Sequence, residues 1–232
     1  MWAKARYGMV IDLEKCTGCG VCEIACAQEN NIPPSTPEEA RQGRTKSWMK
    51  VFAQVEGEAP DLEVSYLPRP CMQCDNPPCT RVCPVHATYL SVETGIVGQI
   101  YGRCIGCRYC ANACPYDVKY FNWHKPEWPA PMEEMLNPDV AVRYKGVIEK
   151  CTFCHHRLQI ARDRARLDGR TQVRESEYQP ACAELCPTRA ITFGDLDNPL
   201  HEVHRLADDP RAFRLMEDLG TQPKVIYLRK VK

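Results

Sequence analysis

One stretch decides the fold of this chain: Cys104-Ile105-Gly106-Cys107-Arg108-Tyr109-Cys110-Ala111-Asn112-Ala113-Cys114-Pro115. Its cysteines follow the pattern C-x2-C-x2-C-x3-C, and a proline comes directly after the fourth. Three thiols so closely spaced can converge on one metal group only from a loop that curls around it, and Gly106 lets backbone amides approach the sulfur atoms. The fourth cysteine lies one helical turn further on and points away. The stretch therefore predicts a metal-binding loop followed by a short helix that ends at Pro115.

The arrangement recurs along the chain, so that all sixteen cysteines fall into four runs. The first run repeats the spacing of the third, the second is C-x2-C-x4-C-x3-C, and the fourth is split by residues 155–181. The runs are Cys16, Cys19, Cys22 and Cys26; Cys71, Cys74, Cys79 and Cys83; Cys104, Cys107, Cys110 and Cys114; and Cys151, Cys154, Cys182 and Cys186. A proline follows every run except the first, where Ala27 stands instead. No cysteine is left over, so each has a predicted role.

This spacing is typical of bacterial ferredoxins, in which the fourth cysteine of each run binds the other cluster of a pair. The β-forming residues 88–97 predict a hairpin between the second and third runs, the connector expected inside one two-cluster unit. We therefore expect these two runs to exchange fourth cysteines, and the first and fourth runs to do the same. The predicted ligands are Cys16, Cys19, Cys22 and Cys186 (site one); Cys71, Cys74, Cys79 and Cys114 (site two); Cys104, Cys107, Cys110 and Cys83 (site three); and Cys151, Cys154, Cys182 and Cys26 (site four). The alternative pairs the first run with the second and the third with the fourth, and it requires the short hairpin to join two domains.

Other uses of the cysteines fit the pattern less well. Structural zinc also uses C-x2-C pairs, but a tightly wound loop of three cysteines would crowd a tetrahedral site. Disulfides need bonding distances that cysteines two residues apart on one loop rarely reach. Covalent c-type haem would use the C-x2-C-H motif at residues 151–155 and would leave Cys182 and Cys186 without partners. We therefore expect four [4Fe-4S] clusters, and the sequence leaves open whether one of them is a [3Fe-4S] cluster.

The sequence predicts an α+β fold of two bacterial-ferredoxin-like two-cluster units, the second inserted into the first, with loop-rich connectors. The outer unit comprises residues 1–60 and 145–232, the inserted unit residues 61–124, and a proline-rich docking loop residues 125–144. Trp123 and Trp128 either anchor a partner or cover a cluster. Strands are expected at residues 6–11, 49–55, 63–67, 190–193 and 225–228, and helices at residues 20–29, 155–167 and 210–219. In the helix at 155–167, Leu158, Ala161 and Ala165 are expected to face inward.

Charge and motif content exclude several classes of function. Lys and Arg total 30, as do Asp and Glu, so no basic excess predicts nucleic-acid binding. The sequence shows neither a nucleotide-binding fingerprint nor a hydrolase triad, so no catalytic site is expected. It also shows no apolar run of about 18 residues, no signal-peptide core and no twin-arginine pair, so we expect any membrane attachment to come through a partner. The cations beside predicted ligands either offset part of the negative charge of the clusters or are ordinary surface charges, and we favour the second interpretation for each of them: Lys15, Arg81, Arg103, Arg108, Lys150 and Arg189.

Four runs in this order, with the fourth split, resemble the four-cluster electron-transfer subunits of the polysulfide reductase, dimethyl sulfoxide reductase and formate dehydrogenase type. The resemblance extends to MVID at residues 9–12, EKCTFC at 149–154, CPTRAITFGDL at 186–196 and LGTQPKV at 219–225. It implies a non-catalytic subunit of a respiratory oxidoreductase complex that relays electrons between a multi-helix, quinone-interacting membrane subunit and a large molybdopterin-type or related subunit. A cytochrome is a further partner that it allows. It also implies a peripheral position at the bacterial inner membrane, on the periplasmic face. The alternative to this function is that of a free soluble polyferredoxin.

Overall fold

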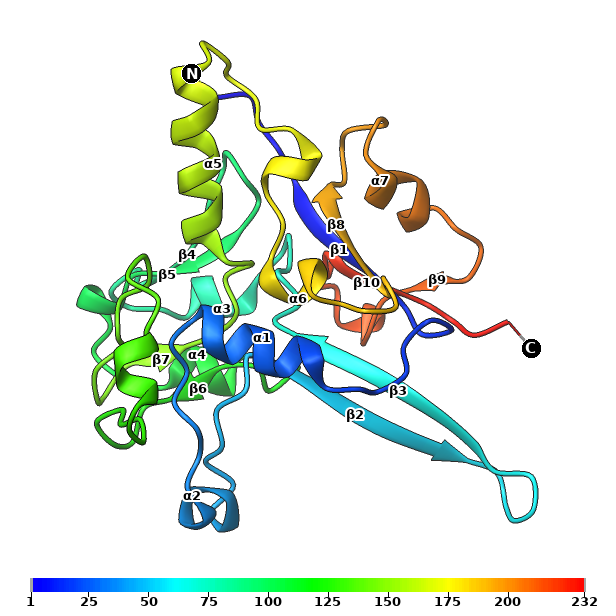
Figure 1. Ribbon diagram of the computed structural model, residues 1–232, viewed down its shortest axis with the longest axis horizontal. Helices are drawn as coiled ribbons and strands as arrows, with labels where there is room; N and C mark the ends of the chain where they lie inside the picture. Colours follow the sequence, from blue (N-terminus) through cyan, green and yellow to red (C-terminus); the bar gives the residue numbers. More distant parts are fainter. Residues whose placement is uncertain (1, 232) are drawn as a thin grey trace.

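The computed structural model describes residues 2–231. The first and last parts of the chain meet in one four-stranded sheet of order β8-β1-β10-β9 (Figure 1). Strand β1 (Tyr7–Asp12) is antiparallel to β8 (Ile191–Asp195) and parallel to β10 (Val225–Leu228), and β9 (Ala212–Phe213) forms one edge. All residues of β1 and β10 are buried, as expected of strands inside a sheet. The strands predicted at residues 6–11, 190–193 and 225–228 are therefore confirmed.

The remaining strands form three two-stranded pairs. The longest is β2 (Met49–Glu56) with β3 (Glu63–Pro70), a hairpin that extends away from the body of the molecule (Figure 1). A short hairpin of β4 (Thr88–Leu90) and β5 (Val97–Gln99) stands between the second and third runs, where the sequence predicts one. Finally, β6 (Tyr120–Phe121) pairs with β7 (Ile148–Glu149), which brings the chain after the third run against the start of the fourth.

The long helices lie where the sequence predicts them, at α1 (Val21–Glu29) and α5 (His155–Leu167). On α5, Leu158, Ala161 and Ala165 are buried, which confirms the inward face. One-turn helices end just before the last cysteine of the other runs, at α3 (Pro78–Arg81), α4 (Tyr109–Asn112) and α6 (Ala181–Glu184). Two further helices were not expected: α2 (Pro37–Arg41), which begins with a capping box, and α7 (Glu202–Ala207).

The helix predicted at residues 210–219 is wrong. Ala212 and Phe213 form strand β9 instead, and the Phe213 ring packs on Tyr227 of β10 with centroids 5.6 Å apart. Met216 has a φ of 49°, which no right-handed helix allows, and only Glu217–Leu219 form a 3-10 turn, η4. Pairing with the sheet edge has overridden the local helical pattern.

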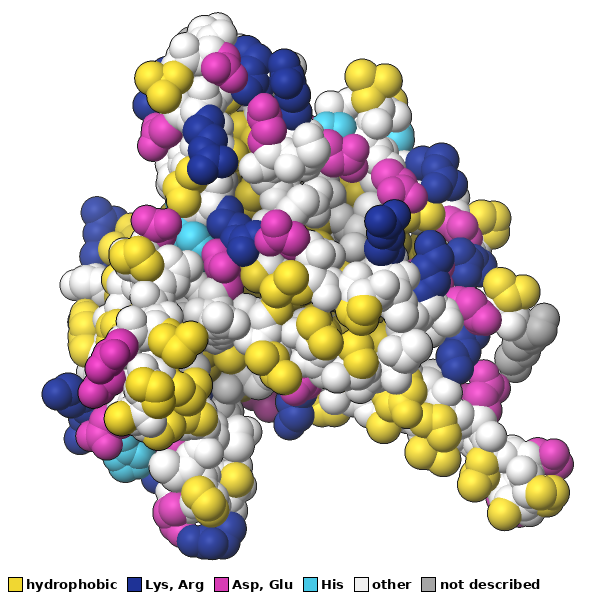
Figure 2. Space-filling model, in the orientation of Figure 1, with side chains coloured by type: hydrophobic (Ala, Val, Ile, Leu, Met, Phe, Trp, Pro, Cys, Tyr) yellow, Lys and Arg dark blue, Asp and Glu magenta, His cyan; other side chains and the backbone are white. Residues whose placement is uncertain are grey.

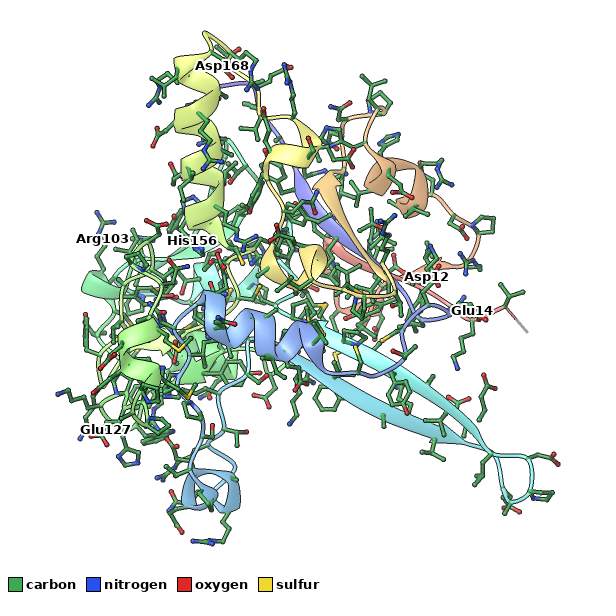
Figure 3. The ribbon with its side chains drawn as sticks, in the orientation of Figure 1. Asp12, Glu14, Arg103, Glu127, His156 and Asp168 are labelled. Atoms are coloured by element: carbon green, nitrogen blue, oxygen red, sulfur yellow. The ribbon has the colours of Figure 1, made fainter. Side chains whose placement is uncertain are left out.

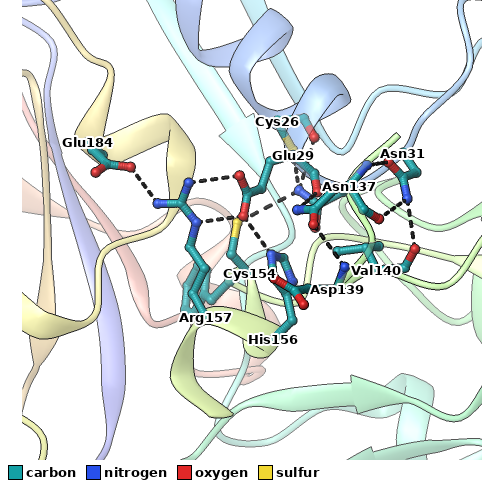
Figure 4. Close-up of polar contacts among 12 residues, drawn as sticks. Cys26, Glu29, Asn31, Asn137, Asp139, Val140, Cys154, His156, Arg157 and Glu184 are labelled. Atoms are coloured by element: carbon teal, nitrogen blue, oxygen red, sulfur yellow. Dashed lines mark hydrogen bonds and ion pairs between the residues drawn. The ribbon is translucent and has the colours of Figure 1, made fainter. Parts of the chain in front are cut away.

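The proline-rich segment 125–144 is irregular, as predicted, apart from the 3-10 turn η2 (Met132–Met135). Asn31 holds it in place, because its side-chain amide donates to the carbonyl oxygens of Asn137 and Val140 at 2.9 and 2.7 Å (Figure 4). Apolar side chains gather over this segment in Figure 2, and Trp128 lines a groove there with Ile24 and Met132. No helix among residues 2–231 is long and apolar enough to cross a membrane.

Candidate metal centres

The four C-x2-C loops share one backbone turn. In each loop the residue before the second cysteine has a positive φ: 71° at Gly18, 49° at Gln73, 70° at Gly106 and 56° at Phe153. A Cβ on Gly106 would lie 2.2 Å from the carbonyl oxygen of Gly146, so glycine is required there for close packing as well as for φ. Gln73 and Phe153 adopt the same conformation with fully buried side chains, which shows that packing holds these two loops in place.

Two of the predicted sites enclose cavities lined by all of their cysteines. At site two, Cys71, Cys74 and Cys79 face Cys114, which comes from the third run. At site one, the first three cysteines of the first run face Cys186, from the far end of the chain. Val51 of β2 and Pro68 of β3 line the cavity of site one, so the base of the long hairpin covers this site. In both places the structure brings together the cysteines that the exchanged pairing predicts.

Site four lies deepest, because all four of its cysteines are buried. Burial, followed by the neighbouring Cys151, Cys154 and Cys182 thiols, raises the pKa of Cys26 well above its usual value. The side-chain amide of Asn30 donates to Sγ of both Cys26 and Cys154, each at 3.7 Å. One amide group therefore joins thiols from the first and fourth runs.

At site three the structure places Cys104 and Cys110 in one apolar cluster, which also contains Cys79 of site two. Helices α3 and α4 pack together there, and Cys83 lies just after α3. The Cys104 Sγ accepts a hydrogen bond from the backbone N–H of Ile148 at 3.4 Å. Cys107 is exposed, so this site opens to the surface.

Prolines after the runs make a turn that delivers an amide to the last cysteine. The N–H of Ala87 donates to Cys83 Sγ at 3.2 Å, and the N–H of Ala190 donates to Cys186 Sγ at 3.3 Å. In the first run Ala27 lets α1 continue to Glu29, so the N–H of Asn30 bonds the Cys26 carbonyl instead. The Asn30 side chain then supplies the donor to sulfur, and this residue was missed by the sequence analysis.

Burial sets the acid–base behaviour of the thiols. It raises the pKa of Cys22, Cys74 and Cys151 to about 12, and that of Cys79 to about 11. Cys83 differs, because the backbone N–H groups of Thr88, Val85 and Ala87 outweigh burial and lower its pKa. Thiols of high pKa ionise when a metal replaces the proton, and thiolates prefer soft metals. Four cysteine sulfurs around one apolar space, as at sites one and two, fit an iron-sulfur cluster better than a hard cation.

Contacts between the sites arrange them in a row. After burial, the Cys71 thiol contributes most to the raised pKa of Cys151, which places site two beside site four. The Cys22 thiol contributes in the same direction to the pKa of Cys182, which places site one beside site four as well. Cys79 and Cys110 share an apolar cluster, so site three follows site two. The order is therefore one, four, two, three, with exposed Cys19 and Cys107 at the ends.

Of the six cations beside predicted ligands, five lie at the surface, whereas Lys150 is buried, so its interpretation as a surface charge is wrong. Five are exposed, and Figure 3 shows Arg103 at the surface; they are Lys15, Arg81, Arg103, Arg108 and Arg189. Lys150 is fully buried, and its Nζ donates to the carbonyl oxygens of Val97 and Cys151. The structure also buries Lys119, at 6% exposure, in the wall of site two, where the sequence analysis had not placed a functional residue.

Trp123 belongs to a cluster of aromatic rings and cations beside the third run, in which the Phe121 and Trp123 rings meet edge to face. Its ring lies 4.7 Å from that of Phe121, and the guanidinium groups of Arg44 and Arg108 lie 4.5 and 4.8 Å from the Trp123 ring. Arg108 stands between two predicted ligands of site three. Trp123 therefore fixes a cation next to that site.

Family models match three parts of the chain. Models described as a 4Fe-4S dicluster domain match residues 62–131 and residues 103–190, and a 4Fe-4S binding domain matches residues 7–28. Together these matches include every cysteine of the four runs. They identify the cysteine loops as iron-sulfur modules.

Several curated proteins are similar over nearly the whole chain. The menaquinone reductase iron-sulfur cluster-binding subunit of Nitratidesulfovibrio vulgaris is 53% identical, over 98% of this chain and 90% of its own length. One subunit of the selenate reductase of Mesobacillus selenatarsenatis is 40% identical, over 96% of this chain and 72% of its own. One chain of the polysulfide reductase of Wolinella succinogenes is 34% identical, over 96% of this chain and 94% of its own. Each of the three is named as a part of a reductase.

Proposed function

The protein belongs to the family of iron-sulfur subunits of menaquinone, selenate and polysulfide reductases, and from this premise we propose that sites one to four each hold a [4Fe-4S] cluster. Its function is electron transfer, since each such cluster, when bound, accepts and releases one electron. The chain contributes four thiolates per site, apolar walls and amide donors to sulfur. Four thiolates per cluster leave no open position for a substrate, so the catalytic site lies in another subunit.

One observation carries the ligand assignment: the cavity of each enclosed site contains a cysteine from a distant run. Cys114 reaches site two, and Cys186 reaches site one. Both contacts support the pairing of second with third and of first with fourth runs. They also favour two ferredoxin-like units, an outer one of residues 1–60 and 145–232 and an inserted one of residues 61–124, with residues 125–144 as a docking loop.

The row of sites gives the protein two functional ends. Cys19 of site one and Cys107 of site three are exposed, whereas the predicted ligands of site four are all buried. We place the electron donor against one exposed cysteine and the acceptor against the other. Partners at these two places shorten the distance to the outermost sites without opening the central ones.

We propose the partners that the family resemblance implies, and the names of the relatives as parts of reductases support a multi-subunit complex. One is a large molybdopterin-type or related subunit, and the other is a multi-helix membrane subunit that handles quinone, with a cytochrome as a further candidate. This chain is then a peripheral subunit of a membrane complex, and we propose the periplasmic face. A free soluble polyferredoxin finds no support, because the similar proteins are named as parts of reductases.

The test is metal analysis of the anaerobically purified chain, followed by one ligand substitution in each unit. We expect about 16 iron atoms and about 16 acid-labile sulfides per chain. Cys114→Ser should change the EPR signal of the cluster bound by Cys71, Cys74 and Cys79, and Cys186→Ser that of the cluster bound by Cys16, Cys19 and Cys22. Stoichiometric zinc without iron would contradict the function. A Cys186→Ser effect confined to the third run would contradict the ligand assignment alone.

A further inference from the structure

Two buried lysines stand beside site two without a carboxylate partner. Lys150 is fully buried and Lys119 is 6% exposed, and neither forms an ion pair within residues 2–231. The Lys119 Nζ donates to Thr88 Oγ1 at 3.1 Å, and the Lys150 Nζ donates to the Cys151 carbonyl at 2.8 Å. All of these acceptors are neutral, so the charge of each ammonium group is left without a protein counter-charge.

The other buried charges nearby are neutralised. Lys224 is also fully buried, but its Nζ lies 2.6 Å from the carboxylate of Asp75. Glu149, the neighbour of Lys150 in the chain, is paired with Arg143 at 2.6 Å. Burying an ion without a counter-charge is costly, so Lys119 and Lys150 call for a negative group that the side chains do not provide.

That negative group is the metal centre itself. Four thiolates around an oxidised cubane core carry a net charge of about −2, and one-electron reduction makes it about −3. Lys119 lines the cavity of site two, and Lys150 bonds Val97, which lines the same cavity. Although burial raises the pKa of Cys79, both lysines act to lower it, which agrees with their position beside that thiol.

Resting on the proposed function, we propose that Lys119 and Lys150 together make site two the site of highest reduction potential in the chain. A nearby cation stabilises the extra negative charge of the reduced state, and low polarity strengthens the effect. With clusters bound, site two would gain one electron, and the neighbouring site that supplied it would lose one.

The other sites receive less of this charge. Lys119 also faces Cys83 of site three, and Lys150 adjoins Cys151 of site four, so each of those sites is beside one lysine. Site one is beside neither, and no charged residue lines its cavity within the described part of the chain. Glu23 of α1 even adds a negative charge next to Cys22. Both lysines therefore reach the cavity wall of site two, Lys119 directly and Lys150 through Val97.

The test is a potentiometric titration of the anaerobic, cluster-loaded chain, followed by EPR. Signals are assigned with Cys114→Ser for site two and Cys186→Ser for site one. Lys119→Met and Lys150→Met remove one charge each, and Lys4→Met removes an exposed one as the matched control. Each buried variant should lower the reduced-to-oxidised ratio of site two at least tenfold at a fixed potential, which is ~59 mV for a one-electron couple.

In the unmodified chain, the first signal to appear on reduction should be the one that Cys114→Ser changes. The proposal is overturned if Cys114→Ser leaves that first signal unchanged, or if the potential of site two is unmoved in a lysine variant that keeps its iron. Should a lysine variant fail to assemble, the order of reduction in the unmodified chain decides. Failure of the proposed function is distinguishable, because the unmodified chain would then show no iron-sulfur signals.

Discussion

The two central sites, two and four, differ from the two end sites, one and three, although all four use cysteine sulfur. Site four has only buried cysteines, and site two adjoins two buried lysines. Each end site has one exposed cysteine, Cys19 or Cys107. Identical donors fix which metal group is bound, whereas burial and nearby charge decide how readily it accepts an electron.

The comparison also separates two ways of holding a ligand loop. The loops of the end sites carry glycine at the position of positive φ, Gly18 and Gly106. The central loops carry Gln73 and Phe153 there, and Gln73 bonds the Val97 N–H at 2.7 Å and the Cys151 carbonyl at 2.8 Å. The end loops thus rely on backbone freedom, and the central ones on packing and buried hydrogen bonds.

Loss of a ligand should affect a central site most. We expect Cys26→Ser to abolish the cluster at site four, so that iron falls from about 16 to about 12 atoms per chain. Because this centre joins α1 to the fourth run, the free energy of unfolding should fall by about 4 kcal/mol or more. Cys19→Ser, at an exposed end, should lose about one iron and leave hydrogen exchange at residues 150–190 unchanged. Equal losses of iron and of unfolding free energy in Cys26→Ser and Cys19→Ser would contradict the distinction between central and end sites.

A methyl group on the glycine before the second cysteine should destabilise an end loop where the neighbouring backbone leaves no space for it. Gly106→Ala forces a Cβ to 2.2 Å from the Gly146 carbonyl oxygen at a φ of 70°, so it should lower the free energy of unfolding by about 3 kcal/mol and weaken site three. Gly20→Ala is the matched control, because φ is 74° but nothing lies within 4 Å of the new atom. It should cost only about 1 kcal/mol. Thermal unfolding measures the stability of both variants. Similar losses of stability would show that the clash with the Gly146 carbonyl oxygen is not the cause.

The cysteine spacing allowed the fold of the centre to be predicted, because ligand geometry restricts the backbone strongly. The spacing anticipated that Cys186 would meet Cys16, Cys19 and Cys22, and the structure places them around one cavity. Strands such as β10 were recognisable from their β-branched residues. Residues 210–219 were mistaken for a helix because the contact of Phe213 with Tyr227 is tertiary and leaves no local signal.

The charges around the sites could not be predicted in the same way. Lys150 precedes a ligand just as Lys15 and Arg103 do, yet only Lys150 of these three is buried. Its burial follows from the packing of β7 and β5, which are far apart in sequence. The absence of proline at Ala27 was visible, but the use of the Asn30 side chain depends on the approach of Cys154.

Removing the Asn30 amide should change site four alone. The amide donor stabilises the extra negative charge of the reduced cluster. Asn30→Leu removes this donor from two thiolates, so the reduced form should be disfavoured by about 1.4 kcal/mol, or roughly tenfold. Redox titration by EPR measures this shift. Gln28→Leu on the same helix is exposed and makes no bond to sulfur, so its potentials should not move. A shift at site one in Asn30→Leu would instead point to a general disturbance of α1.

The smallest expected effect concerns the ion pair that fastens α1 to α5 beside site four. The Glu29 carboxylate accepts hydrogen bonds from Arg157 at 2.6 and 2.7 Å and contacts His156 at 2.6 Å (Figure 4). Hydrogen bonding to Arg157 lowers the pKa of Glu29; burial opposes this, and His156 assists it. A lowered folded-state pKa means that the stabilisation is complete above the usual pKa of 4.5 and is lost as the pH falls through the folded-state value.

Glu29→Gln should therefore lower the free energy of unfolding by about 1 kcal/mol near pH 7, which is seen as roughly fivefold faster bleaching of the visible absorbance on mild warming. The two bleaching rates should converge only as the pH falls from 4.5 through the lowered pKa of Glu29, because the unmodified Glu29 then loses its charge. Glu38→Gln is the control, since Glu38 pairs with Arg41 on the exposed helix α2, far from the cysteines in sequence. Its bleaching rate should match that of the unmodified chain at every pH. If the ratio of the Glu29→Gln bleaching rate to that of the unmodified chain stayed constant with pH, the contact between α1 and α5 beside site four would depend on the packing of the side chain and not on its charge.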